Sequence, residues 1–579
     1  GANAQVVESQ ITKPIEDTLS GIEGIDFIQS VSRAESSQVT VRFKLGRDAD
    51  AAASDVRDRV AQARGALPEE AGESIVQKQE ADAQPIMYLA FSSDRHSLVE
   101  IADYANRIVK DRVQTIPGVA QAQVYGNRYA MRVWLDPERL AGMQLTPADV
   151  ERALRAQNVE IPAGRVESLQ REFTVLSETD LKTPEQFAQI IIKDSEGYLV
   201  RLGDVAQVEL GADSSRFRAR FNGQNAIPLG IVKQAVANPL EISEAIKAML
   251  PQITKSLPEG MKVEVAYDST IFIEKSISEV YVTVFEAMLL VLLVSFLFLR
   301  NWRAVLIPIV TIPVSLIGSF AIMYALGFTI NILSLLAIVL AIGLVVDDAI
   351  VMLENIYRHI EEGMEPYQAA LKGSREIGFA IIAMTLTLAA VYLPFAFSSG
   401  RTGKLFVEFT LTLAGAVIVS GFTALSLSPM MCSKLLRHEP KHGRFYMAGE
   451  RMLLALDGAY RRVLGKVLGR KKTVVAGAGV LFIAAALLFR LLPNELAPQE
   501  DQGLVIGFAS AAAGATIDYT DGYARQMEKI FEGVQERDRS FVIVGFNGVT
   551  SAIGFVGLKD WGDRGRTSQQ IAQSLFPQF

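Results

Sequence analysis

Six apolar segments, each about as long as a membrane is thick, constrain the fold of this chain more than any other feature. A helix rises 1.5 Å per residue, so about 20 residues cross roughly 30 Å of hydrocarbon. The segments lie at residues 279–299, 304–327, 331–353, 377–397, 407–432 and 473–493. Each of them predicts one transmembrane helix.

The rest of the chain has the composition of soluble domains. Hydrophobic residues make up 50% of the 579 residues, yet residues 1–275 and 494–579 carry charges throughout and hold no apolar run of membrane length. The short loops on one side of the predicted helices are rich in basic residues, namely Arg300, Arg303, Arg358, Lys372, Arg375 and several between 434 and 472. The positive-inside rule predicts that these loops are cytoplasmic and that both soluble regions lie on the opposite side.

The two ends of the sequence suggest that it belongs to a longer chain. Residue 1 opens an external region with neither an initiator Met nor a signal peptide, so we expect at least one further transmembrane segment before it. At the other end, a strand–helix–strand unit that starts near residue 500 is not completed by residue 579.

The soluble regions alternate short strand and helix patterns. Residues 38–46 alternate apolar and polar side chains, as a half-buried strand does. A second such segment places four side chains on one face: Met261, Val263, Val265 and Tyr267. Residues 97–116 have helical spacing, and Pro117 and Gly118 end that helix.

Further along, residues 122–134 predict a hairpin that turns at Gly126 and Asn127, between two alternating strands. Repeated strand–helix–strand units of this kind indicate an α+β fold made of split βαβ subdomains. The only cysteine is Cys432, so no disulfide within the chain can stabilise these domains.

Two adjacent acids, Asp347 and Asp348, interrupt one of the apolar segments in the sequence AIGLVVDDAIV. A charge at the bilayer centre costs about 2.5–3.5 kcal/mol on insertion scales, so such residues face a bundle interior or a water path. An ion pair that locks two helices is one interpretation, but no Lys or Arg of the predicted spans is deep enough, since Arg490 lies near a span end. Neighbouring carboxylates in a low dielectric repel each other, which favours reversible protonation and hence a proton relay.

Several motifs occur in order along nearly the whole chain: GNRYAMRVWLDPERLAGMQLTPADV, NWRAVLIPI, GLVVDDAIVMLEN and LPNELAPQEDQG. With these motifs the chain resembles the resistance-nodulation-division (RND) superfamily, in the branch of hydrophobe and amphiphile efflux pumps. The resemblance implies a multi-pass α-helical membrane protein of the Gram-negative inner membrane, with large α+β periplasmic domains made of βαβ (ferredoxin-like) subdomains. It also implies that the first span and the C-terminal half, with the basic partner of the acids, are missing.

The resemblance further implies a division into domains. In chain order, the expected parts are porter subdomains at 1–120, a docking portion at 121–212 with an arm near 165–185 that reaches a neighbouring protomer, a returning porter segment at 213–275, five spans within 276–440, a cytoplasmic interfacial helix at 441–470, a sixth span at 471–495 and the start of a second porter region at 496–579. The amphipathic pattern of 445–468 would also fit a solvated helix docked on its own bundle.

A proton-driven homotrimer follows from the same resemblance, working with a periplasmic adaptor protein and an outer-membrane channel on amphiphilic small molecules. No cofactor, metal or nucleic-acid partner is expected. The sequence has no GxxxxGK[ST] phosphate-binding loop, which argues against ATP as the energy source.

Four aromatic residues match the substrate pocket of the family: Tyr125, Phe541, Phe546 and Phe555. Two further matching positions, Pro85 and Gly548, are not aromatic, and the loop 544–554 is shorter than usual, so the substrate range is open. The alternating pattern around Phe541 fits an ordinary core residue equally well. Phe546 stands in a loop, where a large exposed apolar side chain is harder to explain without a ligand.

Two other functions fit parts of the sequence. A heavy-metal exporter of the same superfamily should show Met, Cys, His or acidic clusters in its soluble regions. These regions hold no Cys and one histidine, His96. A proton-coupled accessory protein of membrane or protein export would use the same helix bundle without an aromatic pocket.

Overall fold

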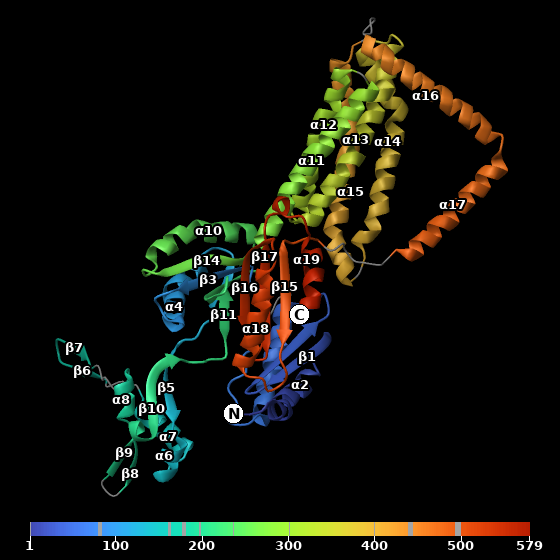
Figure 1. Ribbon diagram of the computed structural model, residues 1–579. Helices are drawn as coiled ribbons and strands as arrows, with labels where there is room; N and C mark the ends of the chain where they lie inside the picture. The colour runs from blue at the N-terminus through green and yellow to red at the C-terminus, as the bar shows by residue number, and fades with distance from the viewer. Residues whose placement is uncertain are drawn as a thin grey trace. The chain divides into compact units, whose positions relative to one another are not determined.

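The structure is a computed structural model that describes residues 2–78, 84–159, 164–175, 181–195, 198–235, 237–299, 301–398, 400–437, 444–492 and 500–579. The chain divides into two compact units (Figure 1). The soluble unit comprises Gly1–Val41, Ala49–Phe272 and Glu500–Phe579, and the helical unit comprises Arg42–Asp48 and Ile273–Gln499.

The described residues contain six helices that are long and apolar enough to cross a membrane, which confirms the six predicted spans. They are α11 (Thr270–Leu299), α12 (Trp302–Ala325), α13 (Ile332–Glu361), α14 (Pro366–Ala396), α15 (Gly400–Leu435) and α17 (Lys471–Leu491). Another helix, α16 (Arg444–Leu468), precedes α17. Both α13 and α14 extend well past their apolar segments, because a helix continues into polar surroundings until a cap or a break ends it.

Four of the long helices, α12 to α15, pack on one another, and α15 contacts the other three. Small side chains let α13 and α15 approach closely: Ala337, Ala341 and Ala416 are fully buried between them. Van der Waals packing of small residues is the usual way in which membrane helices associate, because lipid provides no hydrophobic drive between them.

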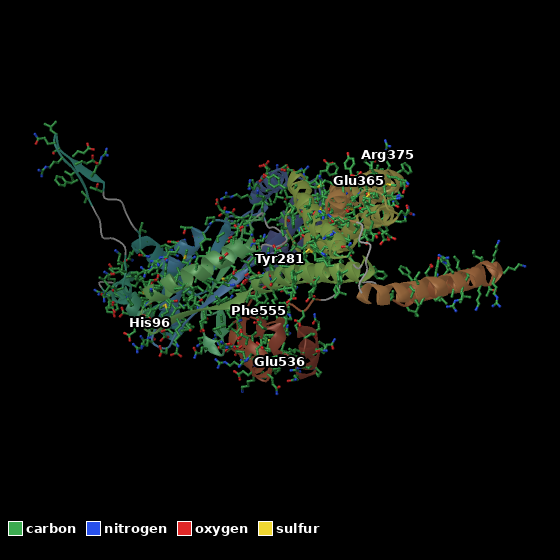
Figure 2. All side chains as sticks on the ribbon, turned by 90° about the horizontal axis from the view of Figure 1, so that it is seen from above. His96, Tyr281, Glu365, Arg375, Glu536 and Phe555 are labelled. Atoms are coloured by element: carbon green, nitrogen blue, oxygen red, sulfur yellow. The ribbon has the colours of Figure 1, made fainter. Side chains whose placement is uncertain are left out.

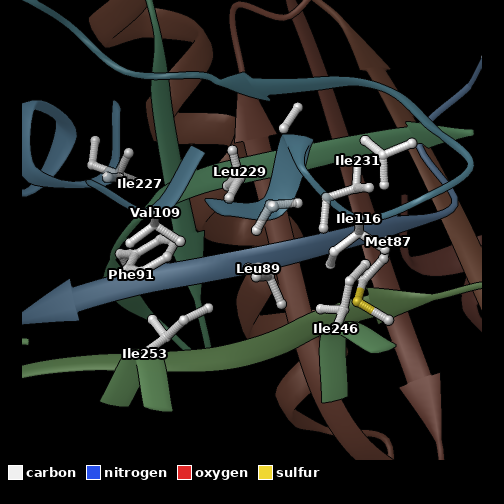
Figure 3. Packing of buried hydrophobic residues seen from close by; sticks show 14 of the residues in the cluster. Met87, Leu89, Phe91, Val109, Ile116, Ile227, Leu229, Ile231, Ile246 and Ile253 are labelled. Carbon is white, nitrogen blue, oxygen red and sulfur yellow. The ribbon is translucent and has the colours of Figure 1, made fainter. Parts of the chain in front are cut away.

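The soluble unit contains a four-stranded antiparallel sheet in the order β14-β3-β13-β4. Its strands are β3 (Met87–Ser93), β4 (Val119–Val124), β13 (Ile227–Lys233) and β14 (Met261–Asp268). One face is covered by α10 (Pro239–Ser256) and by the helical segment α4 (Leu98–Tyr104), η3 (Ala105–Val109) and α5 (Lys110–Gln114), which matches the predicted helix. Figure 3 shows the core between them, where Leu89 and Phe91 of β3 lie among Val109, Ile246 and Ile253.

The predicted hairpin at residues 122–134 is wrong. β4 pairs with β13, whereas β5 (Tyr129–Leu135) pairs with β10 (Ala206–Ala212) in a separate sheet. Gly126 is there for another reason. A Cβ at this position would lie 2.9 Å from Cβ of Ala102 and 3.0 Å from Cγ2 of Ile227, so the chain needs a glycine to pass between α4 and β13.

A second, five-stranded sheet has the order β12-β11-β16-β17-β15. The predicted strand–helix–strand unit near residue 500 is confirmed as β15 (Leu504–Ser510), α18 (Ile517–Glu532) and β16 (Arg537–Val544), followed by β17 (Ser551–Leu558). Two strands come from far upstream, β11 (Arg218–Phe221) and β12 (Gln224–Asn225). α18 and α19 (Ser568–Leu575) cover one face of this sheet.

The remaining elements complete the soluble unit. They are α1 (Ala4–Val7), η1 (Glu8–Thr12), α2 (Lys13–Leu19), β1 (Ile25–Arg33), β2 (Ser36–Phe43), α3 (Ala49–Ala63), η2 (Arg64–Ala66), α6 (Pro137–Gly142), α7 (Pro147–Gln157), β6 (Arg165–Glu167), β7 (Glu172–Thr174), α8 (Pro184–Ala188), β8 (Ile191–Ser195), β9 (Tyr198–Arg201), α9 (Leu202–Val205), η4 (Trp561–Asp563) and η5 (Phe576–Gln578). α6 to α9 share one apolar core with β5, β9 and β10. β6 and β7 form an exposed hairpin.

A buried ionic network fastens the upstream strand β11 to α18. Arg220 is only 3% exposed, and its Nε donates to the two carboxylate oxygens of Glu528 at 2.9 and 2.8 Å. Its Nη1 donates to Asp521, which also accepts from Arg218 and Arg525 at 3.2 Å each. Burial would raise the pKa of Asp521, but Arg220 and Arg525 outweigh it, so that the net pKa is lowered. For Glu528, burial prevails over Arg220 and the pKa is raised.

Removing Arg220 should destabilise the soluble unit strongly. Arg220→Met leaves two buried carboxylates without their shared cation, which typically costs about 3–5 kcal/mol. We expect a clear drop in the apparent unfolding temperature of the purified protein, and no such drop for Arg216→Met, whose side chain is exposed. The lowered pKa means that Asp521 stabilises the wild type above its unfolded-state pKa and loses that contribution as pH falls. The difference between wild type and variant should therefore narrow below about pH 4. Equal unfolding temperatures at neutral pH would refute the role of the network.

Candidate functional site

The two acids lie in the middle of α13, whose N-terminus is capped by Asn331. Successive helical residues point about 100° apart, so the two carboxylates have different surroundings. Asp348 is 3% exposed and faces the packed interior, whereas Asp347 is exposed on the surface of the helical unit. The pair thus combines one enclosed carboxylate with one that a further partner can reach.

Asp348 is held by α15. Ser420 Oγ lies 3.0 Å from Oδ2 of Asp348 and 3.1 Å from the carbonyl oxygen of Val345. Since one hydroxyl carries one proton, it donates to one of these acceptors at a time. The Ser420 hydroxyl can therefore rotate between the carboxylate and the backbone without leaving its place.

The next residue of α15, Gly421, allows α14 to pack directly beside this contact. A Cβ at Gly421 would lie 2.4 Å from Oγ1 of Thr385, closer than any real contact. The Thr385 hydroxyl is buried and has no hydrogen-bond partner among the described residues. A second polar group of the bundle therefore lies against the residue that follows Ser420, and it can bind a water molecule.

Asp347 belongs to a stripe of exposed residues that runs along α13 at helical spacing: Leu336, Leu340, Gly343, Asp347 and Glu354. In the part of the chain that the structure describes, neither Asp347 nor Asp348 forms an ion pair with a Lys or Arg side chain. No group of three or more His, Cys, Asp or Glu side chains is placed to hold a metal ion within these same residues. Asp347 follows apolar residues and a glycine on this stripe, and an unpaired acid there is costly against lipid, so we expect another part of the protein to cover this face of α13.

Three of the four predicted pocket aromatics meet in the soluble unit. Phe541 of β16 and Phe555 of β17 stack with their ring centroids 5.9 Å apart. Tyr88 of β3 lies 5.5 Å from Phe541 and 6.0 Å from Tyr125, which follows β4. The cluster therefore lies between the two large sheets, on the face of each sheet that no helix covers. Figure 2 labels Phe555, one of its members.

Three further members of this cluster, Tyr88, Phe217 and Tyr267, were not predicted from the sequence. Tyr267 lies 5.6 Å from Phe555, and Phe217 lies 6.3 Å from Tyr125. The expectation that Tyr267 shares a face with Val265 is wrong. A bulge shifts the register between these two residues, so Tyr267 pairs with Tyr88 while Val265 pairs with Leu89 on the opposite face.

The aromatic cluster carries no charge near neutral pH. Burial raises the pKa of Tyr88, and the neighbouring Tyr125 raises it further. Burial likewise raises the pKa of Tyr125, and burial followed by the nearby Asp268 raises that of Tyr267. All three phenols stay protonated, so the cluster offers apolar ring faces with a few hydroxyl groups.

Phe546 lies outside this cluster. It stands in the connection between β16 and β17 and is 39% exposed, and in the described residues it takes part in no close ring pair. The preceding Gly545 has φ +89°, and a Cβ there would lie 2.1 Å from the carbonyl oxygen of Arg216. Because only glycine fits at that turn, the direction in which Phe546 leaves the strand is fixed.

Comparisons with known proteins find matches along the whole chain. The model of the AcrB/AcrD/AcrF family matches residues 1–579. An uncharacterized transporter of Haemophilus influenzae is 39% identical over 99% of this chain and 56% of its own length. The multidrug resistance protein MdtF of Escherichia coli is 36% identical over 97% and 56%, and the toluene efflux pump membrane transporter TtgB of Pseudomonas putida is 34% identical over 99% and 57%.

The chain spans about half the length of the curated relatives that it matches. Within that span, the family model covers both soluble regions and all six long helices. The chain belongs to the AcrB/AcrD/AcrF family of RND transporters, as its sequence motifs predicted, and this is a family of secondary active transporters rather than of enzymes.

Proposed function

We propose that this protein exports amphiphilic or hydrophobic small molecules at the expense of the proton gradient. The observation that carries the proposal is the carboxylate pair of α13, one member enclosed beside Ser420 and the other on an exposed stripe. Moving one unit charge across 100 mV is worth about 2.3 kcal/mol, enough to shift a conformational equilibrium substantially. Transport coupled to a proton gradient needs no nucleotide, in keeping with the absence of a GxxxxGK[ST] motif from the sequence.

Protonation would act through packing as well as charge. A proton on Asp348 removes a charge from a site between α13 and α15, and the Ser420 hydroxyl can then turn toward the carbonyl of Val345. A proton on Asp347 removes the charge from the exposed stripe. Each protonation state therefore favours a different partner for these faces, which is the differential interaction that a two-state transporter requires.

The aromatic cluster is the proposed substrate site. Tyr125 and Phe555, together with Tyr88, Phe217 and Tyr267, would present ring faces to flat or hydrophobic compounds without demanding one shape, and the buried Phe541 would support them from behind. Phe546 would contact a ligand from the loop at the edge of this region. Relatives named as a multidrug resistance protein and as a toluene efflux pump support a broad apolar substrate class.

The domain assignment extends the same proposal. Residues 1–120, 213–275 and 496–579 would form porter subdomains in the periplasm, and 121–212 would form a docking portion that carries the exposed β6–β7 hairpin. α16 would lie in the cytoplasmic interface of the inner membrane as part of the segment 441–470, between the five spans of 276–440 and the sixth span at 471–495. We infer a homotrimer that works with a periplasmic adaptor and an outer-membrane channel, as the family generally does.

The carboxylate pair can be tested directly. Asp347→Asn or Asp348→Asn keeps the size of the side chain but removes the proton site, so each variant should lose efflux. The measurement is ethidium accumulation in an efflux-deficient strain that expresses the gene of this chain, with equal amounts of protein in the membrane. Glu354→Gln, on the same exposed stripe of α13, is the matched control and should keep efflux. Wild-type accumulation with either Asn variant would end the relay assignment.

Alanine substitutions of Phe541 and Phe546 should have different effects, the first on stability and the second on the range of substrates. Phe541 is fully buried, so Phe541→Ala should lower the stability of the soluble unit by about 3–5 kcal/mol, seen as a lower apparent unfolding temperature. Phe546 is exposed, so Phe546→Ala should leave stability within about 0.5 kcal/mol and alter the susceptibility profile instead. Phe576→Ala, at a site 83% exposed, is the control for both. Unchanged susceptibility to every tested compound would remove Phe546 from the proposed site.

A further inference from the structure

A buried histidine, His359, lies near the C-terminus of α13, outside the carboxylate pair described above. The His359 side chain is 5% exposed, and each of its ring nitrogens faces a carboxylate. Nδ1 lies 3.2 Å from Oε2 of Glu362 on the same helix, and Nε2 lies 2.8 Å from Oε2 of Glu376 on α14. An imidazole between two carboxylates can take a proton on one nitrogen and release one from the other.

The carboxylate of Glu376 is oriented by its neighbours. Asn355, one turn before His359, donates from Nδ2 to Oε2 of Glu376 at 3.2 Å and to the carbonyl oxygen of Gly373 at 2.9 Å. Arg358 donates to Oδ1 of Asn355 at 2.8 Å. Glu362 and Glu376 are 60% and 38% exposed, so a buried imidazole connects two carboxylates that reach the surface.

His359 lies on the same face of α13 as Asp348. The two are eleven residues apart, which is three turns with a rotation of only about 20° and a rise of about 16 Å. Met352 and Ile356 occupy the turns between them and are fully buried. A proton that passes between Asp348 and His359 therefore needs polar groups from the neighbouring helices.

Two hydroxyls supply such groups. Thr385 of α14 lies against Gly421, next to Ser420, and Ser428 lies two turns further along α15, within the stretch that packs on Ile356. Both hydroxyl oxygens are buried, and neither has a hydrogen-bond partner among the residues described. A buried hydroxyl without a partner costs about 1–3 kcal/mol, and a bound water molecule removes that cost. These positions can thus carry a water-mediated path between the acid and the histidine.

We propose that His359, Glu362 and Glu376 form a proton-release site for the carboxylate pair, at the end of α13 that the nearby basic residues Arg358, Lys372 and Arg375 assign to the cytoplasm. This inference rests on the proposed proton-driven function. A proton leaves the carboxyl group of Asp348 and reaches the carboxylate of Glu376 through water and the hydroxyls. Glu376 passes it to Nε2 while Nδ1–H of the same ring gives its proton to Glu362, which loses it to solvent. Asp348 has then lost one proton to solvent, Glu376, the ring and Glu362 each hold as many protons as before, and the ring has changed its tautomer.

Several charged or titratable groups act on this histidine. On its own helix they are Arg358 and Glu362, on α14 they are Glu376 and, through Glu376, Lys372, and on α15 the thiol of Cys432 lies in the adjoining apolar cluster. The basic groups contact Glu376 or its surroundings rather than the ring. The imidazole itself meets only carboxylate oxygens among its hydrogen-bond partners in the described residues.

A structural role is the competing explanation, because a histidine in the last turn of a helix can also stabilise the helix end and join α13 to α14. The pH dependence of transport distinguishes the two. The purified protein, expressed from its gene, is reconstituted in lipid vesicles, and ethidium transport is measured at a constant pH difference while both pH values are moved across the histidine range of about 5 to 8. Wild type should show a step in rate within this range.

His359→Gln keeps hydrogen-bonding capacity but cannot titrate, so the step should vanish and the rate should fall at least about tenfold. His96→Gln makes the same change in the soluble unit and should match wild type. Figure 2 labels His96, and it labels Arg375 of α14 and Glu365, the residue before that helix. If His359→Gln fails to fold, Glu362→Gln is the second variant, since an exposed side chain is changed, and it should shift the step and slow transport.

The outcomes separate this inference from the function on which it rests. Loss of transport in Asp348→Asn together with a wild-type rate and pH profile in His359→Gln or Glu362→Gln would overturn the release site alone. Transport that persists in Asp348→Asn would overturn the proton relay itself. A lower rate in His359→Gln with the step unchanged would assign His359 a purely structural role and also overturn the proposal.

Discussion

A carboxylate inside an apolar helix is the constraint around which the helical unit is arranged. Desolvating a charge costs several kcal/mol unless other groups compensate it. Here the compensation for Asp348 comes from one serine hydroxyl, and small residues on α13 and α15 bring that hydroxyl within reach. The packing of α15 and the surroundings of the acid therefore depend on each other, since a larger residue at Gly421 would collide with Thr385 of α14 and displace α15 beside Ser420.

The sequence predicted the helical unit well because its signals are local. Six apolar runs of membrane length became six helices, and the acid pair stood out as two adjacent charges within one of them. Helix ends were less predictable. α14 begins at Pro366, eleven residues before the apolar segment that signalled it, because a helix ends at a cap or break rather than at the hydrocarbon boundary. The link between His359 and Glu376 joins two helices and has no signature in either one.

The soluble unit shows where local patterns fail. Residues 122–134 contain two alternating segments around a glycine, but each segment pairs with a distant strand: Val124 lies opposite Leu229, and Leu135 lies opposite Ala206. A strand pattern states which face is apolar, and it does not name the strand that will pair with it. The same limit hid Tyr88 and Tyr267 from the aromatic cluster, because a single bulge beside Val265 reverses the face that simple alternation assigns to Tyr267.

Buried acids in the two units have different hydrogen-bond partners, and this difference bears on function. In the soluble unit, Asp521 and Glu528 share Arg220, so changing the protonation of either acid breaks an ion pair and weakens the attachment of β11 to α18. In the helical unit, Asp348 meets a hydroxyl that has a second acceptor in the carbonyl of Val345, so in the proposed relay Asp348 would gain or lose a proton while Ser420 turns. A buried acid that pairs with a fixed cation stabilises the fold, and a change in its protonation breaks the ion pair. A buried acid beside a rotatable hydroxyl can change its protonation without breaking an ion pair. The acid that can change state at small cost to the fold is the one placed in the middle of a membrane-length helix.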